Sequence, residues 1–259
     1  NLVTGNLDQP GGALCTTPAL DLVATTAGGH FNVWQSRVSG LPEYGGELPV
    51  AALAEEMLTP GEGQVRALIT VAGNPVLSTP NGRQLEQALD GLEFMLSIDL
   101  YINETTRYAD LILPPTAPLE HEHYDSTFNA FAVRNVTRFN EAVLDKPAGA
   151  LDDWEIFVGL AQAFAAKVGN ELKPTKAPEQ MIDMGVRFGP YGDQSPHKLS
   201  LAAIREQPHG IDLGPLQPNL GGRLKTESKA IEAAPAVLVA DLTRFAAQPQ
   251  AVEGELMLI

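Results

Sequence analysis

The sequence predicts an α/β protein with an open, mainly parallel Rossmann-like sheet, helices on both faces, and an irregular C-terminal extension. Three apolar runs between residues 65 and 113 support this prediction, because each ends in a polar turn and helix-like segments separate them. Strand, helix, strand, helix, strand at this spacing indicates right-handed parallel crossovers. Ligands of such sheets bind beyond the carboxyl ends of the strands, so polar residues there are the first candidates for function.

The first strand is predicted over residues 65–72 (VRALITVA), after a helix over residues 50–57. Its apolar run is nearly continuous, which is typical of a strand buried on both faces of a parallel sheet. A helix over residues 81–89 and a second strand over residues 94–98 follow.

A short helix is predicted over residues 103–108, with Glu104 in its first turn. The third strand covers residues 111–113 and is stopped by Pro114 and Pro115. Residues 128–139 alternate polar and apolar side chains, which predicts an extended segment or a hairpin arm.

Residues 154–167 (WEIFVGLAQAFAAK) form the strongest amphipathic pattern, and Asp153 is the predicted cap of that helix. From residue 170 to residue 218 the pattern loosens into irregular connections and short helices. We therefore expect a leading segment over residues 1–50, partly from a neighbouring domain, an α/β core over residues 51–170, and an irregular or helical extension over residues 171–259.

Composition excludes several classes of protein. The 259 residues are 44% hydrophobic and 19% charged, as in a folded globular protein. A net charge of −15 argues against nucleic acid as a partner, and no apolar run approaches the ~18 residues that insertion into a membrane requires. The single cysteine, Cys15, excludes an internal disulfide and is expected to be a small buried or half-buried side chain.

The first strand closes on Gly73, Asn74 and Pro75. Glycine allows a close backbone approach, proline fixes the exit of the chain, and the asparagine amide suits a ligand hydroxyl or phosphate. The alternative is an ordinary turn in which Asn74 bonds its own backbone. Asp99 ends the second strand, where a carboxylate suits a ribose hydroxyl or the N–H donors of guanine; the alternative is a helix cap.

Other polar clusters carry weaker signals. No G-x-G-x-x-G pattern follows a strand and no P-loop is present, so the usual NAD and ATP sites lack their motifs. The Glu120–His123 run (EHEH) has no evident third ligand and is expected to be a solvated loop, so no metal site is predicted. Asp152, Asp153 and Trp154 read as a helix cap with an aromatic anchor.

Together these pieces resemble the molybdopterin oxidoreductases of the dimethyl sulfoxide reductase and formate dehydrogenase superfamily. The ordered set is specific although each piece is weak. It comprises residues 2–13 (LVTGNLDQPGGA), 37–49, 56–62 (EMLTPGE), 66–75, 99–105 (DLYINET), 109–116 (ADLILPPT), Glu120, 153–156 (DWEI) and 209–216 (HGIDLGPL).

The resemblance implies the second of two related α/β domains, each of which cradles one molybdopterin guanine dinucleotide around molybdenum or tungsten. Gly73, Asn74 and Pro75 would line the dinucleotide near its phosphates and ribose, and Asp99 would accept hydrogen bonds from guanine or ribose. Thr105 would touch the phosphates, and Asp153 would be a second carboxylate toward the cofactor. No catalytic residue is implied in this chain, because the metal-ligating residue and an iron–sulfur cluster would lie upstream and a β-barrel domain would follow.

Both ends of the sequence read as internal to a longer polypeptide, so we expect a fragment that is inactive alone. Its expected partners are the other domains of the same polypeptide and an electron-transfer subunit, and its expected location is the cytoplasm. The alternative is a homologue that has lost the cofactor and kept a structural role, as the large peripheral-arm subunit of respiratory complex I resembles this superfamily. A central domain of a thiamine-diphosphate enzyme is a third and weaker interpretation.

Overall fold

The computed structural model describes residues 1–247, and its backbone contacts divide the chain into two units, Asn1–Pro218 and Asn219–Ile259. In the second unit the described part holds helices α8 (Leu220–Arg223) and α9 (Ala236–Ala246). The predicted boundaries at residues 50 and 170 stay predictions, and residues 248–259 of the expected extension lie outside the described residues.

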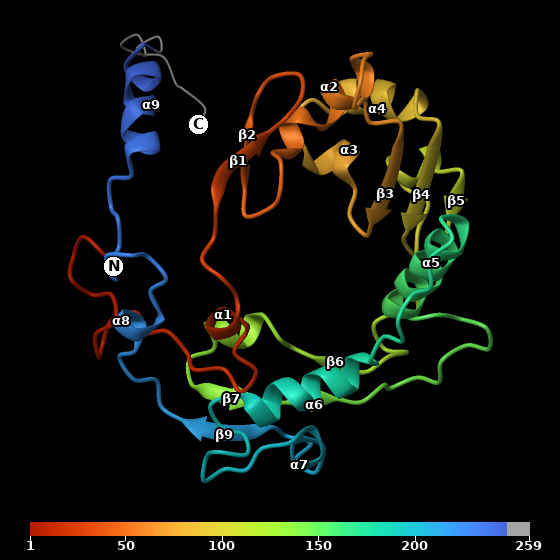
Figure 1. Cartoon of the computed structure of the whole chain (residues 1–259). Coiled ribbons are helices and arrows are strands. Elements are labelled where there is room, and N and C mark those ends of the chain that lie inside the picture. The colour runs from red at the N-terminus through yellow and green to blue at the C-terminus, as the bar shows by residue number, and fades with distance from the viewer. Residues whose placement is uncertain (248–259) are drawn as a thin grey trace, which may run out of the picture. The chain divides into compact units, whose positions relative to one another are not determined.

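The first unit contains the predicted parallel sheet, visible beside α5 in Figure 1. Its order is β3-β4-β5, and both pairings are parallel. Ile69 pairs with Leu96, and Leu96 pairs with Leu111, so the three strands are in register across the sheet. The strands are β3 (Ala67–Val71), β4 (Phe94–Ile98) and β5 (Leu111–Ile112). The α/β class predicted from the sequence is confirmed.

Helices cover both faces of this sheet. Met95 is fully buried on one face, in a cluster with residues from α2 (Leu53–Leu58), α3 (Pro75–Ser78) and α4 (Gly82–Asp90). Its neighbours Leu96 and Ile98 pack with Ile156 of α5 (Asp153–Lys167). Because successive strand residues point to opposite faces, α5 covers the other side.

The first strand is less buried than its sequence suggested. Ile69 and Val71 are 46% and 48% exposed, whereas Leu68 packs into the cluster around Met95. Among the described residues β3 has only one neighbouring strand, and α5 packs against β4 rather than β3. The expectation of burial on both faces is therefore wrong for β3. Helix α5 is likewise only partly buried, with Ile156 its one fully buried residue.

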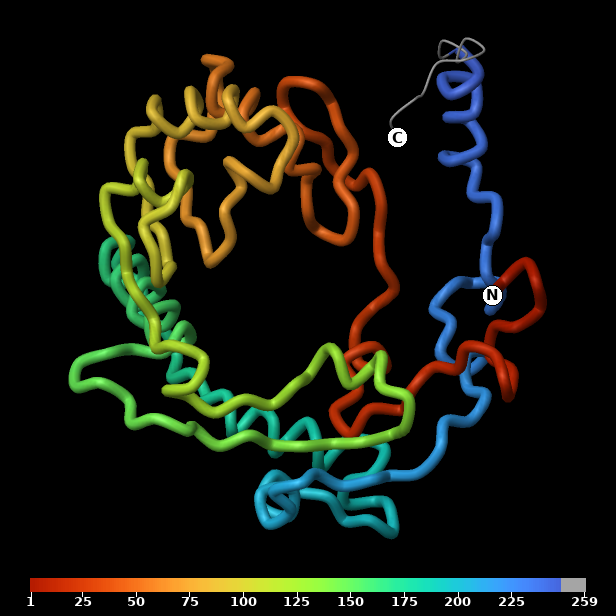
Figure 2. Tube along the Cα trace, turned by 180° about the vertical axis from the view of Figure 1, so that it is seen from behind, coloured from red at the N-terminus to blue at the C-terminus, as the bar shows by residue number. Residues whose placement is uncertain are grey.

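A second hydrophobic cluster forms from segments that are distant in the sequence. It joins Ala19, Tyr124 and Phe139 to residues of two helices near residues 186 and 204. Figure 2 follows the chain from the sheet, in yellow, through the mostly irregular green segment that leads to α5. The elements around this cluster are β6 (His123–Tyr124), η3 (Phe128–Phe131), β7 (Asn135–Thr137), β8 (Phe139–Asn140), α6 (Pro178–Phe188), α7 (Leu201–Arg205) and β9 (Ile211–Gly214).

Strand pairing corrects the prediction of a simple extended segment or hairpin arm over residues 128–139. Its first part is the 3-10 helix η3, and β7 pairs with the distant β9 whereas β8 pairs with β6. The alternation of side chains marked strands correctly, but a local pattern does not specify a partner so far away.

Four further elements lie before the sheet. They are α1 (Leu22–Thr25), the antiparallel pair β1 (Phe31–Gln35) and β2 (Pro42–Tyr44), and η1 (Val50–Ala52). Arg37 ties the turn after β1 to α2 through Glu56. Within residues 1–247, no helix is long and apolar enough to cross a membrane.

Candidate functional site

The turn after β3 is shaped by two consecutive residues with positive φ. Ala72 has φ 51° and Gly73 has φ 78°. A Cβ added at Gly73 would meet nothing within 4 Å, so the backbone there is open to a close approach. Asn74 and Pro75 then begin the short helix α3. The sequence predicted this turn, and the structure places it at the carboxyl end of β3.

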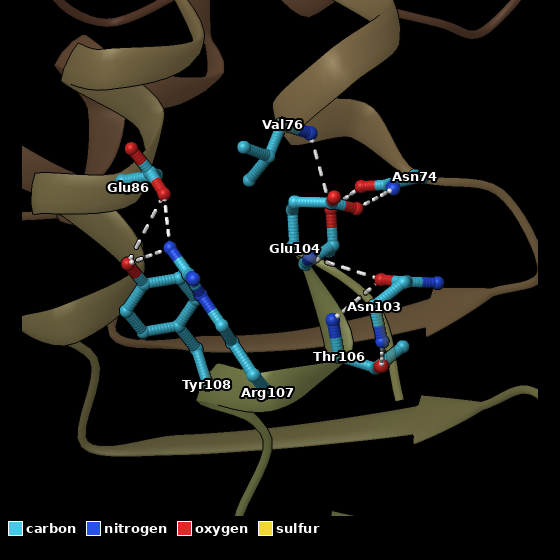
Figure 3. A network of polar contacts seen from close by, with 9 residues as sticks. Asn74, Val76, Glu86, Asn103, Glu104, Thr106, Arg107 and Tyr108 are labelled. Carbon is cyan, nitrogen blue, oxygen red and sulfur yellow. Dashed lines mark hydrogen bonds and ion pairs between the residues drawn. The ribbon is translucent and has the colours of Figure 1, made fainter. Parts of the chain in front are cut away.

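The Asn74 side chain reaches across to the segment after β4. Its Oδ1 accepts from the Thr105 hydroxyl at 2.7 Å, and its Nδ2 donates to the Glu104 carboxylate at 2.6 Å. Figure 3 shows Asn74 and Glu104 pointing toward each other from these two segments. The Asn74 amide therefore joins the segments that follow β3 and β4, and it does not cap α3. It also holds the pKa of Glu104 below the usual range of a glutamate.

Thr105 is completely buried. Its hydroxyl donates to Asn74 and accepts from the Val76 backbone N–H at 3.1 Å, so it satisfies a donor in the first turn of α3. Pro75 supplies no N–H. In this structure Thr105 therefore supports the turn from inside, and its contact with a phosphate stays a prediction.

Asp99 is held at the end of β4 by two hydrogen bonds. Its carboxylate accepts from the Tyr101 backbone N–H at 3.2 Å and from the Asn103 side-chain amide at 3.3 Å. The Asn103 Oδ1 in turn accepts from the backbone N–H groups of Thr105 and Thr106, both at 2.9 Å. Asn103 thus links Asp99 to Thr105, and through Thr105 to Asn74.

This arrangement corrects the helix predicted over residues 103–108. Only η2 (Thr106–Tyr108) forms, preceded by a turn at residues 104 and 105 in which the Asn103 Oδ1 accepts from the backbone N–H groups of Thr105 and Thr106. Glu104 lies before η2. The nearest cation of this segment, Arg107, pairs with Glu86 and lies 5.0 Å from the ring of Tyr108.

A second polar cluster lies where β5 leads toward α5. The Thr116 hydroxyl donates to Asp152 at 2.6 Å, and Lys146 pairs with Asp152 at 3.0 Å and with Glu155. Asp152 and Glu155 form a reciprocal capping box at the start of α5. The helix is therefore capped by Asp152 and not, as predicted, by Asp153, which is its first residue.

Electrostatics of this cluster follow from its contacts. Burial raises the pKa of Asp152, but the Thr116 hydroxyl and the Lys146 ammonium outweigh it and hold that pKa below its usual value. The same ammonium, together with the Asp152 backbone N–H, lowers the pKa of Glu155. Both carboxylates are thus ionised at neutral pH.

Asp153 lies apart from the network of Asn74 and Asp99. It lines a pocket of about 430 Å³ together with His121, Trp154 and Glu179. The Glu120–His123 side chains take separate partners: Glu120 accepts from the Ala117 N–H, His121 contacts Thr116, and Glu122 pairs with Arg205. No group of three potential ligands among residues 1–247 is placed to hold a metal ion.

The structure thus brings Gly73, Asn74, Asp99 and Thr105 to one edge of the sheet and leaves Asp153 elsewhere. Sequence reasoning missed Asn103 and assigned the cap of α5 to Asp153 instead of Asp152, although Asn103 and Asp152 both carried a signal. An asparagine two residues before a threonine pair fits a side-chain turn, and Asp152 stands three residues before Glu155, as a capping box requires.

Known proteins match this chain over its sheet and polar edge. The model of the molybdopterin oxidoreductase family matches residues 6–163. The assimilatory nitrate reductase catalytic subunit of Bacillus subtilis is 34% identical over 131 residues, which is 51% of this chain and 17% of that protein. The F420-dependent formate dehydrogenase 1 subunit alpha of Methanococcus maripaludis is 28% identical over 180 residues, which is 62% of this chain and 25% of that protein.

A third relative is the F420-dependent formate dehydrogenase subunit alpha of Methanocaldococcus jannaschii, 33% identical over 107 residues and 15% of its own length. The chain therefore spans a quarter or less of each of these relatives. The family match covers more than half of the chain and includes the whole parallel sheet, the turn at Gly73 and the Asp99–Thr106 segment. The chain belongs to the molybdopterin oxidoreductase family.

Proposed function

We propose that this chain supplies one of two guanine-dinucleotide-binding domains in a molybdenum or tungsten oxidoreductase with formate-dehydrogenase-like or oxygen-atom-transfer chemistry. The relatives named as a nitrate reductase and as formate dehydrogenases support this assignment. When bound, the molybdopterin cofactor with its metal would supply the redox chemistry, and the residues of this chain would bind and orient it. The isolated chain would be inactive, with an iron–sulfur cluster and an electron-transfer subunit provided elsewhere.

The observation that carries the proposal is the polar edge formed by the ends of β3 and β4. Asp99 presents a half-buried carboxylate, which can accept two N–H or O–H donors from a base or a ribose. Gly73 has no side chain, and the position that its Cβ would occupy has no other atom within 4 Å. Both features suit a nucleotide at the carboxyl end of a parallel sheet.

The same edge is poorly suited to a phosphate. The Val76 N–H is taken by Thr105, Pro75 has no N–H, and Arg107 pairs with Glu86. The exposed carboxylate of Glu104 also lies here, hydrogen-bonded to Asn74. We therefore assign the edge to the base and ribose end of the dinucleotide, with Asp99 as the principal contact and Asn74 and Thr105 as supports of the turn.

The experiment is to produce the full-length polypeptide in a host that makes the cofactor, and to measure bound metal and the guanine nucleotide released by acid. We expect about one metal ion and about two guanine nucleotides per chain in the wild type. We expect a several-fold decrease in Asp99→Ala. Asp90→Ala, an exposed carboxylate at the end of α4, is the matched control and should retain both.

A well-folded wild type with neither metal nor guanine would contradict the proposal and would favour the cofactor-free structural homologue. If Asp99→Ala instead bound normal amounts of metal and guanine, the proposal of a cofactor-binding domain would stand, but Asp99 would not be a cofactor contact.

A further inference from the structure

A pocket of about 630 Å³ lies between α5 and the segment that follows β5, and its lining shares no residue with the network of Asn74 and Asp99. Its walls are Leu113–Pro115, which follow β5, the segment 147–151, and the α5 residues Ile156, Gly159 and Leu160. The volume falls within the range of roughly 300–1,000 Å³ that is usual for small-molecule sites, and aliphatic and proline side chains dominate the lining.

Gly159 keeps this pocket open. It lies in the middle of α5, where glycine costs a helix about 1 kcal/mol relative to alanine. A Cβ added there would meet nothing within 4 Å. The helix thus presents bare backbone on the side that lines the pocket.

The segment over the pocket is fixed at both ends. Lys146 pairs with Asp152 and Glu155 at the start of α5. At the other end the Leu151 carbonyl accepts from the Thr116 N–H at 3.0 Å, next to a parallel bridge between Pro115 and Leu151. The Ala150 N–H donates to the Pro147 carbonyl and closes a turn between these anchors. The walls are therefore held in place by contacts within the chain, which lowers the cost of binding.

The charges at the rim define the class of ligand. Glu155 is neutralised by Lys146, and Glu120 accepts from the Ala117 N–H at 2.8 Å. The Glu120 carboxylate disfavours an anion, whereas Glu155 is already paired with Lys146 and adds little to the charge of the rim. From this pocket we propose a second, separate binding site, for a mainly apolar compound that carries no negative charge. It does not depend on the dinucleotide site.

The test compares two fluorescent probes that differ by one sulfonate group, N-phenyl-1-naphthylamine and 1-anilinonaphthalene-8-sulfonate, on the full-length polypeptide. We expect saturable binding of the neutral probe at one site, and binding of the sulfonate at least tenfold weaker. Gly159→Phe should fill the pocket and weaken the neutral probe at least tenfold. Gly222→Phe, in α8, is the matched control, because its Cβ would also meet nothing within 4 Å.

Unchanged binding in Gly159→Phe, equal binding of both probes, or no saturable binding would overturn the proposal. So would self-association of the wild type that Gly159→Phe abolishes, since a second copy would then be the occupant. If Gly159→Phe does not fold, a neutral aryl diazirine can be photolysed on the wild type. Labelled peptides from residues 113–115, 147–151 or 156–160 would support the site, and labelling confined to other residues would overturn it.

Discussion

Two polar clusters hold the ends of the parallel strands, and they are built on different principles. The cluster after β3 and β4 is centred on neutral groups, with the fully buried Thr105 hydroxyl between Asn74 and Val76. The cluster after β5 is charged and half exposed, with Lys146 between Asp152 and Glu155. Buried hydrogen-bonding groups are costly to leave unpaired, whereas exposed ion pairs contribute little. The neutral cluster is therefore the stronger of the two.

The largest effect should come from Thr105→Val, which keeps the shape of the side chain and removes its hydroxyl. The Val76 N–H and Asn74 Oδ1 lose their buried partner, so we expect a loss of about 2–3 kcal/mol in the free energy of unfolding. Urea unfolding of the chain measures it. Thr105→Ser retains the hydroxyl and should lose clearly less; equal losses in the two variants would show that packing, not hydrogen bonding, matters here.

A smaller effect is expected from Asp152→Ala. It removes the N-cap of α5 and the partner of Thr116 and Lys146, which should cost about 1–2 kcal/mol in the same measurement. Its neighbour provides the control, because Asp153→Ala keeps the cap and should cost less. If Asp153→Ala proved the more damaging substitution, the capping assigned to Asp152 would be incorrect.

The smallest effect is a dependence on pH that distinguishes the charged cluster. Burial raises the pKa of Asp152, but the contacts with Thr116 and Lys146 lower it by more than burial raises it, so the net shift is downward. Its contribution is complete above the ordinary aspartate pKa of about 3.9 and is lost as the pH falls through the lower folded value. The difference in stability between wild type and Asp152→Ala should therefore be constant from pH 5 to pH 7, in round numbers, and shrink below about pH 3.9. A difference that instead grew with acid would reverse the sign of this shift.

The sequence predicted the parallel sheet because its signal is local. Residues 94–98 are one strand as expected, and the helix after residue 81 and the turn at Gly73 lie where periodicity and glycine placed them. The exposure of Ile69 and Val71 could not be read from the sequence, since an apolar run does not say how many neighbours a strand has.

The position of the candidate site could be predicted from the sequence, whereas its hydrogen-bond network could not. Asn74 and Asp99 stand at strand ends, which the order of elements gives directly. That Asn74 bonds Thr105, and that Asn103 links both to Asp99, depends on side-chain geometry that spans 31 positions of the chain. The pairing of β7 with β9 escaped prediction for the same reason.

That distant pairing has a consequence for the making of the protein. Arg134 beside β7 pairs with Asp212 of β9, 78 residues later. At roughly 5–20 residues per second, a ribosome needs on the order of 4–16 seconds to cover that stretch. Throughout this interval β7 waits without its partner strand, whereas β3, β4 and β5 can pair soon after they emerge. The parallel sheet can thus form during translation, and the half of the first unit around β7 closes only once β9 has left the exit tunnel.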